Sequence, residues 1–118
     1  MKLIAVYGTL KHGYGLHAAF PDMGFVGVTV VRDYTLYSNG AYPAATPKKG
    51  ARILAEVYNV PDGTFDYIDD IEKGAGYDLH SIDTEFGPAD MWVWPSPPPG
   101  WEKVKPDAEG VENWSRKV

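Results

Sequence analysis

The chain has 118 residues, a formal net charge of −5, 44% hydrophobic residues and no cysteine. A chain of this length corresponds to one domain, so we expect residues 1–118 to form a single domain. The absence of cysteine excludes disulfide bonds and thiolate metal sites. Because the charge is negative and the basic residues are scattered apart from Lys48-Lys49, nucleic-acid binding is disfavoured.

The N-terminal segment carries no recognisable targeting signal. Its apolar run ends at Tyr7, which is too short for a secretory signal. No stretch approaches the roughly 20 apolar residues that cross a membrane. We therefore expect a cytoplasmic protein without membrane contact.

The first apolar run, residues 2–7, is typical of a buried β-strand. Gly8 then ends the strand, where the backbone either turns sharply or closely approaches another group. A glycine-containing turn at a strand end can present several backbone N–H groups together, and such groups can bind a carboxylate or an oxyanion. The alternative is an ordinary turn without a ligand.

Thirteen glycines, ten prolines and sixteen aromatic residues (eight Tyr, four Phe, four Trp) indicate a turn-rich, mostly β protein. β-Branched and aromatic residues predict six strands, at residues 2–7, 25–31, 34–37, 53–60, 77–84 and 90–94. Gly24 and Gly27 mark candidate bulges, and residues 15–20 could form one helical turn. Many short strands with few helices predict an α+β fold, with a small, mixed, curled β-barrel.

One main helix is predicted at residues 64–73. Asp62-Gly63-Thr64 supplies turn and N-cap residues, and Gly74 suits the left-handed position after the last turn. Phe65, Ile68 and Ile71 recur every three residues and form one apolar stripe.

The C-terminal quarter of the chain is irregular. Residues 95–100 form a proline-rich loop, which either stiffens a cover over the sheet or presents a polyproline ligand to a partner protein. From residue 102 a polar tail follows, with Val104, Val111 and Trp114 as its few apolar anchors.

Glu72 is the candidate catalytic residue. With about 100° per residue and Phe65 at zero, Ile68 lies at about 300° and Glu72 at about 340°, within the apolar stripe. Desolvation and the negative end of the helix dipole would raise the pKa of an inward carboxyl group, as a general acid/base requires. The alternative is a carboxylate at the edge of the stripe that is solvated or paired with Lys73 or Arg52.

No other constellation of catalytic residues is evident. His12, His17 and His80 lack ligand spacing, so we expect no metal site. Asp69-Asp70 is expected on the solvated flank of the helix. No serine lies in a nucleophile-elbow pattern.

Four segments resemble the gamma-glutamylcyclotransferase-like superfamily. Val6-Tyr7-Gly8-Thr9-Leu10 resembles its Tyr-Gly-Thr-Leu signature, and Gly40-Ala41-Tyr42-Pro43-Ala44 resembles its glycine-x-Tyr-Pro-Ala lip. Ala55-Glu56-Val57-Tyr58 resembles the strand before its helix. Ile68-Asp69-Asp70-Ile71-Glu72, followed by Gly74 and Tyr77, resembles the helix and turn with the catalytic glutamate.

This resemblance implies a small mixed β-barrel with flanking helices and assigns roles to individual residues. Glu72 would be the general acid/base. Tyr42 would line the pocket entrance, and Tyr77 would brace the glutamate or the substrate. The substrate loop would be formed, through its backbone, by Tyr7, Gly8, Thr9 and Leu10.

The implied enzyme cyclises a γ-glutamyl group to 5-oxoproline and releases an amine or amino acid. No cofactor or metal is required. Three positions depart from the family pattern: Leu79 replaces a frequent arginine, Met91-Trp92-Val93-Trp94 replaces a strand ending in tyrosines, and Glu112-Asn113-Trp114 replaces Ser-Gly-Asp-Trp. Two other functions stay open, a non-catalytic small-molecule binder that uses the same pocket and a module that presents the proline-rich loop.

Overall fold

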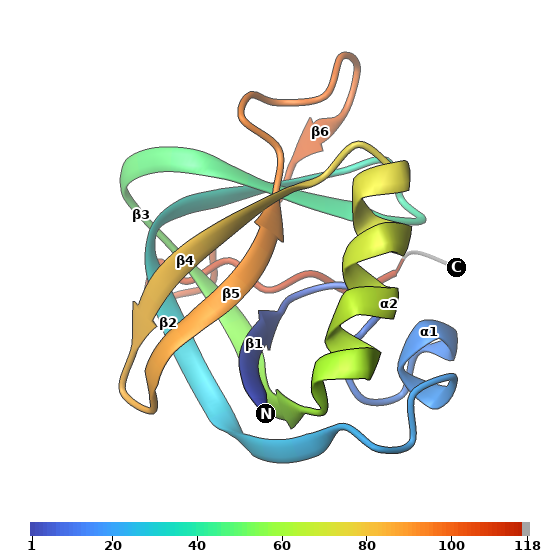
Figure 1. The fold of residues 1–118 in the computed structure, drawn as a ribbon. Coiled ribbons are helices and arrows are strands. Elements are labelled where there is room, and N and C mark those ends of the chain that lie inside the picture. Colours follow the sequence, from blue (N-terminus) through green and yellow to red (C-terminus); the bar gives the residue numbers. More distant parts are fainter. Residues whose placement is uncertain (117–118) are drawn as a thin grey trace.

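The computed structural model describes residues 1–116 and contains one six-stranded sheet with the order β4-β5-β1-β3-β2-β6. β1 pairs in parallel with β5, and the other neighbouring strands are antiparallel. The predicted α+β fold with a small, mixed, curled sheet is confirmed (Figure 1). The elements are β1 (Lys2–Val6), α1 (Gly15–Ala18), β2 (Gly24–Ser38), β3 (Pro43–Val60), α2 (Asp62–Gly74), β4 (Asp78–Thr84), β5 (Gly87–Val93) and β6 (Glu102–Lys103).

A corner in the long β2–β3 hairpin curls the sheet. The register shifts between Arg32 and Tyr34, and Asp33 between them has a φ of 68°. Gly50 on β3 also has a positive φ, 87°, and its N–H donates to Asp33 Oδ1 at 2.9 Å. An extra residue in one strand increases twist and bends the pair, so the two halves of the hairpin can face each other.

Contacts between strands that are not neighbours in the sheet close the barrel. The N–H of Trp94, just beyond β5, donates to the carbonyl of Ala45 on β3 at 2.8 Å. On the other side, the Tyr34 hydroxyl of β2 lies 3.0 Å from His80 Nδ1 of β4. The first half of β3 is therefore held beside the end of β5.

Strand β1 is buried on both faces, which explains its unbroken apolar run. Successive side chains of a strand point to opposite faces. Ala5 and the following Tyr7 accordingly join the core inside the barrel, whereas Ile4 and Val6 join the core against α2. Phe65 and Ile68 supply the α2 side of that second core, and Figure 1 shows α2 running alongside β1 and β5.

The predicted strands differ most from the observed ones in the β2–β3 hairpin, and β5 also begins earlier than predicted, at Gly87. The ranges 25–31 and 34–37 belong to one strand, β2, because the Asp33 corner bends it without ending it. β3 begins at Pro43 and not at residue 53, because its first half gains its pairing from Tyr34–Ser38 of β2. The local sequence does not predict a strand in this half, because it contains Pro47, Lys48-Lys49 and Gly50.

The limits of the main helix also differ. α2 begins at Asp62, after an extended Pro61, without a side-chain cap. The Thr64 hydroxyl donates to Asp22 Oδ2 at 2.6 Å and therefore does not cap the helix. Gly74 is still helical, and the left-handed residue is Gly76 with a φ of 96°.

The polar tail is anchored more firmly than its composition indicates. β6 was not predicted, and it pairs with the end of β2. Glu112 is buried, where its carboxylate accepts hydrogen bonds from Thr35 Oγ1 at 2.7 Å and Leu36 N at 2.8 Å, and an ion pair from Lys103 at 2.9 Å. Trp114 is buried inside the barrel, and its indole N–H donates to Ser38 Oγ at 3.0 Å.

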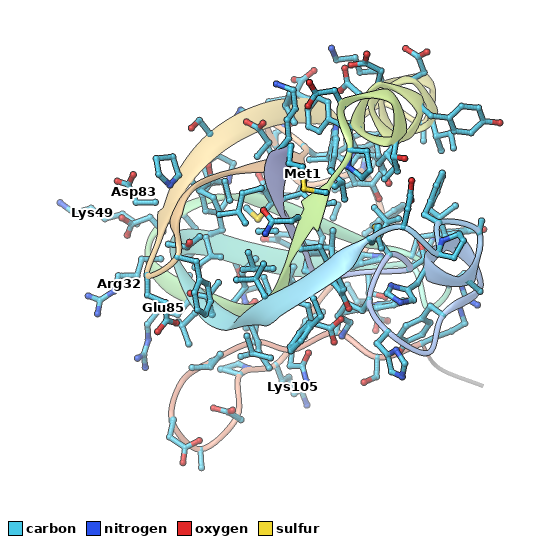
Figure 2. The ribbon with its side chains drawn as sticks, turned by 60° about the horizontal axis from the view of Figure 1, so that its bottom comes forward. Met1, Arg32, Lys49, Asp83, Glu85 and Lys105 are labelled. Carbon is cyan, nitrogen blue, oxygen red and sulfur yellow. The ribbon has the colours of Figure 1, made fainter. Side chains whose placement is uncertain are left out.

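Charged side chains gather at the end of the barrel remote from α2. Figure 2 shows Arg32, Lys49, Asp83 and Glu85 on the opposite side of the view from that helix.

Within residues 1–116, no helix has the length and apolar character needed to cross a bilayer.

Replacing Trp114 tests the anchoring of the tail. Because its side chain is 1% exposed, Trp114→Ala should lower the free energy of unfolding by about 3–5 kcal/mol. Urea denaturation measures the change, with Phe25→Ala on the exposed part of β2 as the control, expected to cost less than about 1 kcal/mol. Equal effects of the two variants would contradict the buried position.

Candidate functional site

A cavity of ≈ 270 Å³ opens between the end of β1, the C-terminal half of α2 and the loop after β5. Its volume is just below the range of about 300–1,000 Å³ common for small-molecule pockets. The lining is mostly apolar and aromatic, and it consists of Val6, Tyr7, Gly8, Thr9, Leu10, Leu16, Tyr42, Pro43, Ile71, Glu72, Ala75, Tyr77, Trp92, Trp94 and Trp101.

All residues assigned to the site from the sequence meet in this one cavity. They come from three separate segments, and the chain brings them together only when the barrel closes against α2. The lining includes the candidate acid/base Glu72 and the candidate binding residues Tyr7, Gly8, Thr9, Leu10, Tyr42 and Tyr77. Their roles toward a ligand stay predictions.

Tyr7 forms part of the cavity floor through a buried and fully bonded side chain. Its hydroxyl donates to the carbonyl of Trp92 on β5 at 2.6 Å and accepts from the N–H of Ala45 on β3 at 3.0 Å. Burial raises the pKa of Tyr7 well above its usual value, and the nearby Tyr77 and Glu72 add to the shift. This hydroxyl is therefore a structural group and is kept protonated.

Gly8 is required because the chain passes very close to Pro43. A Cβ atom at position 8 would lie 2.8 Å from Pro43 Cγ, a separation that real Cβ atoms avoid. The glycine therefore lets the Tyr7-Gly8-Thr9-Leu10 loop pack against the lip segment of residues 40–44.

The carbonyl groups of this loop are occupied, whereas its amide groups are free. Gly8 O accepts from Lys11 N at 2.9 Å, and Thr9 O accepts from His17 N at 3.1 Å. Leu10 O lies 2.8 Å from His17 Nδ1, which must carry the proton because a carbonyl only accepts. Among residues 1–116, no protein group accepts from the N–H of Gly8, Thr9 or Leu10. Successive free N–H groups form an anion-binding concavity.

Glu72 faces the same cavity without a charged partner. Lys73, one alternative partner considered from the sequence, pairs with Asp69 at 2.9 Å. Arg52, the other alternative, donates to the carbonyl of Glu109. No ion pair or side-chain hydrogen bond to Glu72 occurs in the described part of the chain. Burial raises the pKa of Glu72 from 4.5 to about 7, so the group exchanges a proton readily near neutral pH.

Tyr77 and Tyr42 complete the wall near the lip. The Tyr77 hydroxyl donates to the carbonyl of Pro43 at 2.6 Å, so it braces the lip and not the glutamate. Burial raises the pKa of Tyr77, with a further contribution from Glu72. Tyr42 is 52% exposed, as expected for a residue at the entrance.

Several lining residues were not assigned to the site from the sequence. Ile71 was expected to extend the apolar core stripe, but it is exposed toward the cavity while Phe65 and Ile68 are buried. Trp94 and Trp101 flank the proline-rich loop and both line the cavity. The only signal for them was the aromatic composition, because their meeting depends on the path of that loop.

Asp69 does not lie on the solvated flank, in contrast to the prediction. Its carboxylate accepts from Trp92 Nε1 at 2.9 Å and pairs with Lys73. Burial alone would raise the pKa of Asp69, but the hydrogen bonds from Trp92 and Lys73 lower it overall. Asp69 therefore stays ionised and positions Trp92, while the neighbouring Asp70 is exposed as predicted.

Candidate metal ligands are not clustered. Within residues 1–116, no group of three His, Cys, Asp or Glu side chains lies close enough to hold a metal ion. The residues that can bind a ligand in the cavity are therefore the loop amides, the Glu72 carboxyl group and the aromatic wall.

Gly8→Ala tests the close approach to Pro43. Since the added methyl group would overlap the proline ring, we expect a loss of about 1–3 kcal/mol in unfolding free energy, measured by urea denaturation. Gly15→Ala is the matched control, because a Cβ at position 15 would meet no atom within 4 Å. Equal stability of the two variants would show that the loop does not pack on Pro43.

Glu72→Gln tests the burial of the carboxyl group. A carboxyl pKa raised to about 7 in the folded state means that the protonated form is favoured, so its contribution to stability is full below pH 4.5 and is lost as the pH rises through 7. The Glu72→Gln variant avoids this loss because glutamine is neutral at every pH. The melting temperature of the variant minus that of wild type should therefore be higher at pH 8 than at pH 4. Asp66→Asn, exposed on the same helix, is the control and should show no such difference. A pH-independent effect of Glu72→Gln would contradict the raised pKa.

Comparison with known proteins places the chain in a family. The family described as gamma-glutamyl cyclotransferase, AIG2-like, matches residues 4–116. Protein PH0828 of Pyrococcus horikoshii is 42% identical over 97 residues, 82% of each chain. Its crystal structure has a TM-score of 0.78 at 39% identity, covering 88% of this chain and 86% of that one.

One other relative and one structural neighbour are similar to the chain. The gamma-glutamylcyclotransferase family protein YtfP of Escherichia coli is 32% identical over 103 residues, covering 86% of this chain and 90% of its own. A mouse AIG2-like protein, 21% identical, shares the fold with a TM-score of 0.73, covering 100% of this chain and 98% of its own. The chain therefore belongs to the gamma-glutamyl cyclotransferase, AIG2-like family.

Proposed function

We propose that this protein is an enzyme that cyclises the γ-glutamyl group of a small molecule to 5-oxoproline and releases an amine, with Glu72 as general acid/base. The observation that carries the proposal is an unpaired carboxyl group with a pKa near 7 in a cavity that is also lined by three residues with free backbone N–H groups. The family match and the names of the relatives support the reaction type.

The two ends of the site suit the two ends of a γ-glutamyl group. The free N–H groups of Gly8, Thr9 and Leu10 would bind the α-carboxylate, or the oxyanion that develops on the γ-carbonyl oxygen. Glu72 would then lie beside the α-amine. Folding the substrate so that its own amine reaches its carbonyl is the main entropic requirement, and a preformed cavity supplies it.

One carboxyl group, that of Glu72, can carry out both proton transfers of the reaction. The neutral α-amine attacks the γ-carbonyl carbon, forming the C–N bond of a five-membered lactam, and the Glu72 carboxylate accepts a proton from the attacking nitrogen. When the intermediate collapses, the bond to the departing nitrogen breaks and Glu72 donates the same proton to that nitrogen. The products are 5-oxoproline and the free amine. A carboxyl pKa of about 7 suits both transfers near neutral pH.

Glu72→Gln tests the chemical role. Glutamine keeps the shape but cannot accept the proton, so release of 5-oxoproline from γ-glutamyl amides should fall by about 10²–10⁴-fold, the usual range for general acid–base catalysis. Liquid chromatography of the product measures the rate, and calorimetry measures substrate binding, which should change little.

The control for this test is Asp66→Asn, which removes an exposed carboxylate from the same helix and should keep full activity. Binding without product in the wild-type protein would favour a non-catalytic binder instead. Retained turnover in folded Glu72→Gln would overturn the role of the glutamate.

A further inference from the structure

We infer that the leaving-group side of the cavity is an aromatic subsite, formed by Trp94 and Trp101, that selects γ-glutamyl derivatives of aromatic amines without a carboxylate. The inference rests on the proposed function, because it concerns the amine that this reaction would release. The shape of the wall, its rigidity and its charge each support the inference.

The wall consists of aromatic rings that pack against one another in tilted and edge-on arrangements. The ring centroids of Trp94 and Trp101 are 6.3 Å apart with an interplanar angle of 36°, and Tyr77 meets Trp94 edge-on at 6.0 Å and 88°. All three side chains line the cavity. Aromatic rings attract further rings in offset or edge-on arrangements, so a flat apolar group is the best match for this surface.

Trp94 is fixed in place before any ligand binds. Gly76, at a φ of 96°, lies directly against its ring, where a Cβ would be 2.9 Å from Trp94 Cζ2. Trp101 follows the proline-rich loop, and its N–H donates to Pro98 O at 3.3 Å. A rigid aromatic surface binds a ring without a large loss of conformational entropy.

The indole N–H of Trp94 does not take part in the proposed subsite. It is buried and has no hydrogen-bond partner in the described residues. An unpaired buried donor costs free energy, and most buried polar groups in proteins are paired. Because this nitrogen has no accessible surface, a ligand in the cavity would contact the ring of Trp94 and not this donor.

The charge of the lining excludes a second carboxylate. Glu72 is the acid among the lining residues, and no Lys, Arg or His lines the cavity within residues 1–116. Arg116 packs over Tyr42 at 5.8 Å and donates to Ala41 O, and Lys11 donates to Trp114 O at 2.5 Å. An amino acid as leaving group would therefore place its carboxylate against lining residues that, within residues 1–116, include no cation, which is unfavourable.

Three substrates distinguish the effect of an aromatic ring on the leaving amine from the effect of a carboxylate on it. γ-Glutamylphenethylamide and γ-glutamylphenylalanine differ only in the carboxylate, and γ-glutamylethylamide lacks the ring. We expect kcat/KM for 5-oxoproline release to be at least about tenfold higher for the phenethylamide than for either of the others. Calorimetry on Glu72→Gln should show the lowest Kd for the phenethylamide.

Trp101→Ala locates the ring subsite. It should lower kcat/KM for the phenethylamide by about tenfold and change that for the ethylamide by less than about twofold, whereas a general structural defect would lower both. Trp101→Phe should restore most of the preference. Phe25→Ala, an exposed aromatic residue on β2, is the control and should leave both rates unchanged.

The outcomes distinguish this inference from the proposed function. Equal use and equal binding of the phenethylamide and the ethylamide, or no loss of preference in Trp101→Ala, would overturn the aromatic subsite. Equal use of γ-glutamylphenylalanine would overturn the exclusion of the carboxylate. If no compound yields 5-oxoproline but Glu72→Gln and wild type both bind the phenethylamide in preference, the proposed function fails and the subsite stands.

Discussion

The site depends on the buried hydroxyl group of Tyr7. This one atom donates to the carbonyl of Trp92 on β5 and accepts from the N–H of Ala45 on β3, so it links the end of β1 to both neighbouring strands. The bond from Trp94 N to Ala45 O continues the link. Because both polar functions of the hydroxyl are satisfied, its burial is stabilising, and the loop that follows Tyr7 begins from a fixed point.

The remaining features of the cavity follow from that fixed point. Gly8 passes against Pro43, and the carbonyl groups of Gly8, Thr9 and Leu10 accept hydrogen bonds from Lys11 and His17. The N–H groups of Gly8, Thr9 and Leu10 have no hydrogen-bond partner within residues 1–116. Glu72 has no positively charged partner in the described part of the chain, because Lys73 is already paired with Asp69. Asp69 also accepts a hydrogen bond from Trp92. Burial without a charged partner then keeps the pKa of Glu72 raised.

Prediction from the sequence was most accurate where a pattern is local. The alternation in β1, the three-residue spacing of Phe65 and Ile68, and the angle of Glu72 each correspond to the observed structure. It failed at the start of β3 and at β6, where pairing with β2 decides the conformation. It also missed the burial of Glu112, because its partners Thr35 and Leu36 are more than 70 residues away in the sequence.

The sequence by itself determined the fold class, the family and the inward direction of Glu72, because strand alternation, helix periodicity and short motifs are properties of neighbouring residues. Only the tertiary structure decided which groups share the cavity. The unpaired state of Glu72, the free amides after Tyr7 and the meeting of Trp94 with Trp101 all depend on contacts between distant segments. Such contacts form when the barrel closes, and no local pattern encodes them.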